Sequence, residues 1–347
     1  MRFFVNKEVS GGIHFWLAPD NPRAISKVFI SVDGRRTLEL SAWITDDNIR
    51  AHGWHSTGQC VYMITENELP ELFSANRIEI FDADTNILIF RSLREKVFLP
   101  AKLINITTTV QKNTFVEQNL FDLFQYSYFN VDRLSEEVVQ SIMQGPWLTS
   151  SLITGAVIFP RYEVFFQDDN CVSGVLVQDP FVEMAARMRW LQAKKAVADD
   201  PAQNWRLGAL LESVRFAAEY DLSNSRNIKR FLRMLPEPCY RFLYNPLCRQ
   251  FGTRSPSDPF GPGNSIVAME IISRIKVVGH SDYTNEYYTA LLDRLGVAPI
   301  EMSHPKPSED VLSLATLLRS VDAARDMVAF DTVISDAVRH AVGKSWG

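Results

Sequence analysis

The sequence predicts a protein of two domains: a small antiparallel β-sandwich or barrel over residues 1–105, and a mainly helical α/β domain with a short parallel sheet over residues 106–347. Three observations lead to this prediction. The chain of 347 residues is longer than one typical hydrophobic core organises. Before residue 105, apolar residues form short runs separated by turn signals, which is typical of strands. After residue 115 the apolar period becomes about 3.6, which indicates helices.

Short segments rich in aromatic and β-branched residues mark the strands of the first domain. They are 12–18, 27–32, 37–43, 59–64, 77–81 and 87–91. Turn-forming residues separate them, and the clearest turn is Asp33-Gly34, because both residues accept the positive φ angles of a tight hairpin. This spacing of strands and turns predicts an antiparallel sandwich or barrel.

Two groups in this domain carry metal-ligating residue types. Asp82, Asp84 and Asn86 alternate as at the start of a calcium loop, but the downstream Gly and Glu of such a loop are absent. Turn chemistry favours the alternative interpretation, a hairpin turn. His52 and His55 lack a third ligand, which favours loop residues over a metal site. The sequence therefore predicts no metal site.

Helical periodicity and capping residues define the second domain. The expected helices cover 134–143, 180–198, 202–220, 225–235, 264–276, 284–295 and 308–342. Asp200 before Pro201 and Ser308 before two acidic residues are expected to cap two of them. The apolar runs 150–159 and 172–177 are expected to be buried parallel strands.

The most informative feature is the corner at Gln178, Asp179 and Pro180, where an apolar strand leads directly into a helix. Such a corner directs backbone N–H groups and the positive end of the helix dipole at one point, where phosphate or sulfate binds favourably. We therefore expect an anion site here.

Composition excludes several classes of protein. A net charge of -5, with a pI near 5.8, argues against nucleic-acid binding through an overall positive field. No apolar run approaches the length of a membrane span, and the start of the chain lacks a signal-type apolar segment, so we expect a cytoplasmic protein. The four cysteines are too irregularly spaced for a disulfide framework and are expected to be reduced and mostly buried.

Segment 226–254 is strongly basic. It holds seven Arg and Lys residues, Arg249 and Arg254 among them, against Glu237 alone, a local charge of +6. One interpretation is a site for an anionic partner such as a nucleotide or glycan, because Arg recognises phosphate, sulfate and carboxylate through paired hydrogen bonds. The alternative is a solvated helix face that pairs with acidic residues elsewhere.

Residues 145–305 resemble a diverged bacterial carbohydrate sulfotransferase of the P-loop-like α/β fold. In that family a strand ends in Arg-Asp-Pro-x-x-Arg-x-x-Ser, and here the strand ends in the run 178–186, which retains Asp179-Pro180. Asn245 then precedes the Arg249 to Arg254 turn, followed by a helix, the strand Val277-Val-Gly-His280, and a helix ending in Leu295-Gly296. The resemblance implies that Gln178, Asp179 and Pro180 face the 3′-phosphate of 3′-phosphoadenosine-5′-phosphosulfate, the sulfuryl donor.

The sequence departs from the family motif at three positions: Gln178 and Glu183 replace its arginines, and Ala186 replaces its serine. The Pro-Lys-x-Gly loop for the 5′-sulfophosphate is also absent from the sequence. Two alternatives follow: the donor site is degenerate, or Arg187, Arg189 and the basic segment with Arg249 and Arg254 compensate. His280, at an expected strand end, is the candidate base for an acceptor hydroxyl, with a hydrogen-bonded structural histidine as the alternative.

Three functions remain open from the sequence. One is a sulfotransferase-like protein with a degenerate donor site, acting in bacterial cell-surface polysaccharide production or modification. Another is an active sulfotransferase-type enzyme with an altered donor pocket. A third is a non-catalytic scaffold whose β domain binds a protein or a glycan; Phe15, Trp16, Trp43 and Trp54 are its candidate aromatic platform, with core packing as the alternative.

Overall fold

The computed structural model describes residues 1–9, 11–19, 21–94, 97–144, 149–167, 170–301 and 306–346. These residues pack into two compact units. The first unit contains Met1–Asn105, Val116–Gly155 and Val164–Val172, and the second contains Ile106–Phe115, Ala156–Glu163 and Ser173–Gly347. The boundary expected after residue 105 coincides with the first passage between the units, but the chain returns to the first unit twice.

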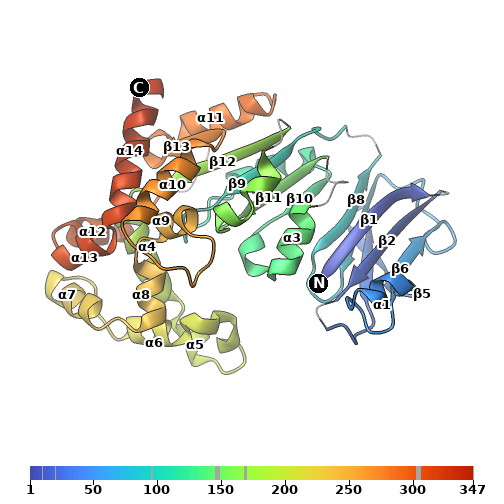
Figure 1. Ribbon diagram of the computed structural model, residues 1–347, viewed down its shortest axis with the longest axis horizontal. Coiled ribbons are helices and arrows are strands. Elements are labelled where there is room, and N and C mark those ends of the chain that lie inside the picture. Colours follow the sequence, from blue (N-terminus) through green and yellow to red (C-terminus); the bar gives the residue numbers. More distant parts are fainter. Residues whose placement is uncertain are drawn as a thin grey trace. The chain divides into compact units, whose positions relative to one another are not determined.

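Two four-stranded antiparallel sheets form most of the first unit (Figure 1). In spatial order, one sheet consists of β1 (Arg2–Val9), β2 (Gly12–Ala18), β6 (Gln59–Ile64) and β5 (Ile44–Thr45). The other consists of β4 (Arg35–Ser41), β3 (Lys27–Val32), β7 (Arg77–Asp82) and β8 (Leu88–Leu93). Helix α1 (Asp47–Ala51) follows β5. Antiparallel sheets are thus confirmed for the N-terminal part, and their strand content fits a sandwich.

The expected turns are present in this unit. Asp33 and Gly34 have φ angles of 50° and 80° and join β3 to β4, which confirms the hairpin. At the second turn, the Asp82 carboxylate accepts hydrogen bonds from the backbone N–H and the hydroxyl of Thr85, at 2.7 and 2.5 Å. Oδ2 of Asp82 therefore closes a turn.

The first unit also contains elements that follow the two sheets. These are β9 (Lys102–Ile106), α2 (Phe115–Leu120), β10 (Tyr126–Tyr128), α3 (Glu136–Gln144) and β11 (Ser151–Gly155). β10 and β11 pair in parallel, with Tyr126 opposite Ser151. The strand expected over 150–159 is shorter than expected and belongs to the first unit, whereas the sequence placed it in the second domain.

The second unit is mainly helical, as expected. In chain order it contains β12 (Cys171–Val177, of which the last five residues belong to this unit), α4 (Pro180–Ala193), α5 (Lys195–Asp199), α6 (Leu211–Ala218), α7 (Ser225–Arg233), α8 (Glu237–Leu243), α9 (Pro246–Gly252), α10 (Gly263–Ser273), β13 (Val277–His280), α11 (Thr284–Arg294), α12 (Glu309–Arg319), α13 (Asp322–Met327) and α14 (Ala329–Trp346).

β12 and β13 form a parallel pair, in register from Gly174 opposite Val277 to Val177 opposite His280. Helix α11 packs closely on β13 at Gly279. A Cβ atom at this position would lie 2.7 Å from the side chain of Tyr287, so the close approach requires glycine. Both strands therefore end at the same edge, which places Gln178 and Ser281 close together.

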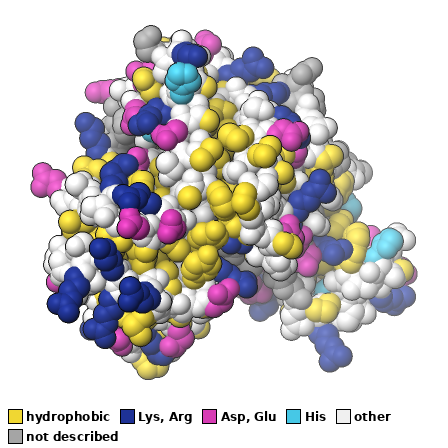
Figure 2. Space-filling model, turned by 60° about the vertical axis from the view of Figure 1, so that its left-hand side comes forward, with side chains coloured by type: hydrophobic (Ala, Val, Ile, Leu, Met, Phe, Trp, Pro, Cys, Tyr) yellow, Lys and Arg dark blue, Asp and Glu magenta, His cyan; other side chains and the backbone are white. Residues whose placement is uncertain are grey.

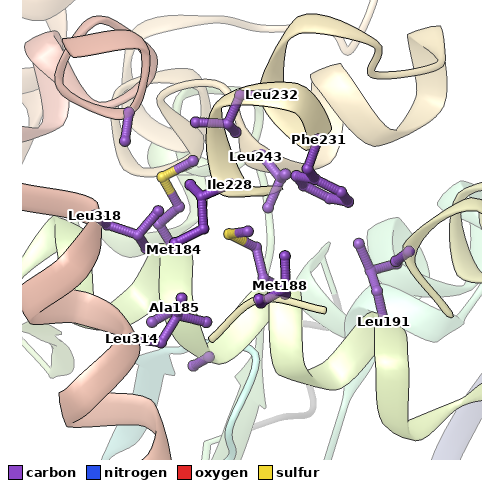
Figure 3. Packing of buried hydrophobic residues seen from close by; sticks show 14 of the residues in the cluster. Met184, Ala185, Met188, Leu191, Ile228, Phe231, Leu232, Leu243, Leu314 and Leu318 are labelled. Atoms are coloured by element: carbon purple, nitrogen blue, oxygen red, sulfur yellow. The ribbon is translucent and has the colours of Figure 1, made fainter. Parts of the chain in front are cut away.

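The helical core of the second unit lies on one side of α4 (Figure 3). Met184, Met188 and Leu191 recur at helical spacing and are buried at 1% exposure or less. They pack against Phe231 of α7 and Leu318 of α12, among other apolar residues. This packing fixes α4, and with it the corner before α4.

Three expected helices are interrupted. The helix expected over 180–198 is divided into α4 and α5. The helix expected over 308–342 is three helices, α12 to α14, although Ser308 caps the first of them as predicted. The helix expected over 202–220 begins as a 3-10 helix, Asn204–Leu210, and Gly208 breaks its regularity with a φ of 51°. Helices α8 and α9 were not expected. Their apolar patterns are short, and Pro236, Pro238 and Pro246 interrupt them in the sequence.

A buried ion pair joins two strands of the first unit. Glu79 lies directly opposite Arg91, and its carboxylate accepts from Nε and Nη2 of Arg91 at 2.9 and 2.8 Å. Arg91 is 1% exposed, and its guanidinium lies 3.8 Å from the ring centroid of Phe121. Glu79 also accepts from Nη2 of Arg77 at 2.9 Å, so loss of Arg91 leaves Glu79 paired. Loss of Glu79, in contrast, leaves the buried charge of Arg91 uncompensated.

We expect Glu79→Leu to lower the free energy of unfolding by about 3–5 kcal/mol, measured by urea denaturation. The double variant Glu79→Leu with Arg91→Leu should recover most of this loss, because it removes the uncompensated guanidinium. Glu39→Leu is the matched control, since its pair with Arg36 is exposed and is worth about 0–1 kcal/mol. Equal losses for the single and double variants would contradict this account.

Candidate functional site

A cleft of about 530 Å³ opens in the second unit where β12 and β13 end. Its walls come from the segment that follows β9, the start of α4, the turn after β13, and α12. Its lining consists of Thr109, Gln111, Lys112, Asn113, Leu176, Gln178, Asp179, Val182, Glu183, Ala186, Ser281, Asp282, Thr284, Lys306, Pro307, Val311, Leu312 and Arg319. Ligands of α/β folds bind at this edge, beyond the carboxyl ends of parallel strands.

The corner at Asp179 forms as its sequence dictates. Pro180 occupies the first position of α4, where its fixed φ suits the helix and its missing N–H is not needed. The Asp179 carboxylate caps the helix, because Oδ1 accepts from the N–H groups of Phe181 and Val182 at 3.0 and 3.1 Å. The N–H groups that an anion would use are therefore bonded to the protein's own carboxylate.

The same carboxylate also binds a cation. Nη2 of Arg319, at the end of α12, donates to Oδ2 of Asp179 at 2.5 Å. The Arg319 guanidinium lies 4.7 Å from the ring centroid of Phe181. The one Arg of the cleft is thus already paired at the corner.

Glu183 places a second carboxylate in the first turn of α4. It is 6% exposed, and its Oε1 accepts from Nε of Arg187 at 2.6 Å and from the N–H of Val110 at 2.9 Å. Burial raises the pKa of Glu183, while the Arg187 charge and these hydrogen bonds oppose the rise. Arg187 also donates to the carbonyl of Phe242 at 2.9 Å, so its guanidinium is held inside the unit.

Behind the corner, two helix N-termini cap each other. The buried carboxylate of Asp331, on α14, accepts from the N–H groups of Leu247 and Cys248 at the start of α9, at 3.0 and 2.7 Å. In return, Oδ1 of Asn245 accepts from the N–H groups of Phe330 and Asp331 at the start of α14, at 2.8 and 3.1 Å. Burial raises the pKa of Asp331 to about 7.

A small cavity lies between the carboxyl groups of Glu183 and Asp331. Its volume is about 10 Å³, close to the size of one water molecule. It is lined by Thr108, Gln178, Pro180, Glu183, Pro246, Leu247 and Asp331. The charge of Glu183 adds to the burial that raises the pKa of Asp331, because both carboxyl groups face this cavity.

His280 is buried and connects three elements. Its Nδ1 accepts from the N–H of Asp282 at 3.2 Å, so Nε2 carries the proton and donates to Oγ of Ser335 at 3.1 Å. The Ser335 hydroxyl points to the carbonyl of Gln178 at 3.5 Å. Burial lowers the pKa of His280, which favours this neutral form.

The residues Ser335, His280 and Asp282 superficially match a nucleophile, base and acid. Nδ1 of His280 lies 3.4 Å from the Asp282 carboxylate. A catalytic triad requires a proton on Nδ1 and a free Nε2 toward the serine, which is the opposite tautomer. Ser335 and His280 are also 3% and 2% exposed and do not line the cleft. This geometry favours the structural alternative for His280.

The structure does not bring the predicted anion-binding arginines together. The guanidinium of Arg249 lies 4.5 Å from the ring centroid of Phe260, outside the cleft lining. Arg254 is exposed; its backbone N–H donates to Asp258 at 2.7 Å, and its carbonyl accepts from Arg161. Gln178, Asp179 and the start of α4 do line the cleft, with Oε1 of Gln178 accepting from the Asp179 N–H at 2.9 Å.

The basic segment presents its cations mainly on α7. Arg226, Lys229, Arg230 and Arg233 are exposed there, while Ile228 and Phe231 are buried. Arg241 pairs with Glu237 on α8 at 2.7 Å. The segment is therefore an amphipathic surface helix followed by arginines that make separate contacts.

The candidate aromatic platform of the first unit divides into core and surface. Phe15 is fully buried and stacks on Tyr62 at 4.6 Å between ring centroids. Trp16 and Trp54 stack on each other at 5.5 Å, and Trp43 is 42% exposed. Core packing is thus confirmed for Phe15.

Sequence reasoning missed several cleft residues. Lys112, Lys306 and Arg319 supply its cations, and Asp282 supplies a third carboxylate beside Asp179 and Glu183. The residues Asp179 and Arg319 are separated by 140 positions, and no local pattern signals their pairing. Positive and negative side chains are balanced in this cleft.

The comparisons with known proteins do not assign the chain to a family. The chain matches no protein-family model and no curated protein. Within the described ranges, no cluster of His, Cys, Asp and Glu is arranged to hold a metal ion, and the four cysteines are free and buried. Among the helices of the described residues, none has both the length and the apolar character needed to cross a bilayer.

The raised pKa of Asp331 predicts a pH effect on stability. Between the ordinary aspartate pKa and about 7, the folded protein holds a proton that the unfolded chain has lost. The free energy of unfolding therefore falls as pH rises through this window, by on the order of 2–4 kcal/mol. Urea unfolding at pH values of about 5, 6, 7 and 8 measures how the free energy of unfolding changes with pH.

Asp331→Asn should flatten the slope, because the amide does not titrate, and it keeps one of the two oxygens that accept from the α9 N–H groups. Asp336→Asn, an exposed position on the same helix that pairs with Arg339, is the control and should keep the wild-type slope. A wild-type slope in Asp331→Asn would show that another group is responsible.

Proposed function

We propose that the chain is a sulfotransferase-like protein with a degenerate donor site, which binds a saccharide in the cleft and does not transfer a sulfuryl group. The observation that carries the proposal is the corner before α4, where the protein's own carboxylates, Asp179 and Glu183, occupy the positive end of the helix.

The residues of this corner do not fit the 3′-phosphate of the sulfuryl donor. An entering phosphate would meet two carboxylates, and the N–H groups of Val110, Phe181 and Val182 already bind them. Transfer of a sulfuryl group, like that of a phosphoryl group, needs cations and free donors around the equatorial oxygens. Arg187 is held by Glu183 and Phe242, so it does not supply the missing charge.

The remaining cleft suits a polyhydroxylated ligand of low charge. Gln111, Asn113 and Ser281 contribute amide and hydroxyl groups. The hydroxyls of Thr109 and Thr284 donate to the carbonyls of Gln111 and Ser281, so they offer acceptors to a ligand. The volume of about 530 Å³ falls within the range of small-molecule sites. The resemblance to carbohydrate sulfotransferases supports a role in bacterial cell-surface polysaccharide production or modification.

The degenerate donor site predicts a gain of function on removing one charge. Wild type should give no heat when titrated with adenosine 3′,5′-bisphosphate at millimolar concentration in a calorimeter. Asp179→Ser keeps a capping oxygen but removes the carboxylate and releases Arg319, so it should tighten bisphosphate binding by about ten-fold or more.

Asp322→Ser is the matched control, since it also frees an arginine, Arg325, from an exposed aspartate pair. It should bind no bisphosphate. Tight binding of the bisphosphate by wild type would overturn the degenerate-site proposal. Transfer of a labelled sulfuryl group to any acceptor would also overturn it. Unchanged affinity in Asp179→Ser would remove the corner from consideration as a former phosphate site.

Saccharide binding is tested separately, by saturation-transfer NMR with neutral and uronic-acid oligosaccharides. We expect signals from at least one neutral oligosaccharide, and we expect Gln111→Ala to weaken its affinity by about five-fold or more through loss of a hydrogen bond. Gln140→Ala, a half-buried glutamine on α3 that does not line the cleft, is the control and should leave the signals unchanged. Absence of transfer to every oligosaccharide would contradict this function.

A further inference from the structure

A second cavity lies in the same unit at the opposite, amino-terminal end of β13. It is a groove of about 540 Å³ between α10, α11 and α14. Its lining consists of Met269, Ile272, Ser273, Lys276, Val277, Val278, Ala290, Asp293, Arg294, Ile334, Ala337, Val338, Ala341, Val342, Ser345 and Trp346. None of these residues lines the polar cleft.

The walls of the groove are aliphatic. Ile272 of α10 and Val338 of α14 are buried, whereas Ala337 and Ala341 of α14 are exposed small residues one helical turn apart. Figure 2 shows hydrophobic side chains gathered along the middle of the face on which the C-terminal helices lie. Small side chains at these two positions keep the groove open along α14.

The charged residues of the groove are placed at one end. Lys276 immediately precedes β13, and Arg294 is the last residue of α11, which runs back along β13. Asp293 is the one carboxylate in the lining, so two cations face one anion. This end therefore favours a negatively charged group, while the rest of the groove favours hydrocarbon.

The groove has a volume of about 540 Å³, which falls within the range of small-molecule sites. A single aliphatic chain matches both the volume and the lining.

We propose that this groove binds an aliphatic chain with an anionic head group, such as a fatty acid, with the head between Lys276 and Arg294 and the chain between α10 and α14. The groove is separate from the polar cleft, because the two share no lining residue.

The test is displacement of a dansylated fatty acid by saturated carboxylates of increasing length. We expect dodecanoate to displace the probe, and affinity to rise by up to about four-fold per added methylene over the series. Dodecanol should bind more weakly than dodecanoate by about two- to five-fold, because it lacks the charge.

Variants separate the two parts of the site. Arg294→Gln should remove the preference for dodecanoate over dodecanol, and Ala341→Trp should weaken both by more than about ten-fold by filling the groove. Ala341 is exposed, so the larger side chain does not disturb the core. Lys344→Gln, on the same helix but facing a different cavity, is the control and should bind as wild type does.

Three outcomes would overturn the proposal. These are no displacement by dodecanoate up to its solubility limit, displacement that Ala341→Trp does not change, and a concentration-dependent dimer in sedimentation that Ala341→Trp dissociates. The last outcome would assign the groove to a second copy of the chain.

Discussion

The buried carboxylate of Glu183 is the contact on which the candidate site depends. It joins the N–H of Val110, in the segment after β9, to the Arg187 guanidinium on the next turn of α4. Arg187 in turn reaches the carbonyl of Phe242 on α8. A buried charge costs much free energy unless it is fully paired, so these partners are fixed once Glu183 is placed there. One side chain thereby positions one wall of the cleft and uses the cation that sequence reasoning had assigned to a ligand.

The second constraint is the exchange of caps between α9 and α14. Asn245 has a φ of 44°, which lets its side chain turn toward the start of α14. In the other direction, the Asp331 carboxylate on α14 accepts hydrogen bonds from the start of α9. Four N–H groups that helix ends leave unsatisfied are thus bonded without water. His280 and Ser335 extend this frame to the carbonyl of Gln178, so polar contacts hold the corner from behind.

Local signals account for what the sequence predicts well. The strands 12–18, 27–32 and 59–64 have the observed bounds, because their apolar runs end at turn residues. The β12 to α4 corner was also located correctly, since an apolar run, a capping Asp and a Pro specify it within ten residues. The membership of β11 in the first unit was not predictable, because strand pairing depends on contacts distant in sequence.

The candidate site was predictable in place but not in charge. Gln178 and Asp179 lie at the cleft as the strand-to-helix corner implies. The role of Arg319 depends on packing between α12 and α4, which no motif encodes. The local charge of segment 226–254 gave a wrong expectation for the same reason. Its positive residues are close together in the sequence, but α7 carries the exposed cations while Arg249 lies against Phe260. Charge density along a chain indicates a site only when the fold brings the charges together.

The two ends of β13 show how one short strand separates two chemistries. At its carboxyl end, Ser281 and Asp282 extend into a cleft whose polar groups come from loops and helix starts. At its amino end, Val277 and Val278 contribute to a groove whose walls are the aliphatic faces of α10 and α14. Helix starts expose N–H groups and helix sides expose apolar stripes, so the polarity of each cavity follows from which part of a helix reaches it. A parallel strand flanked by helices therefore places polar recognition at one end, and it leaves the other end for hydrocarbon wherever the flanking side chains are small, as Ala337 and Ala341 are.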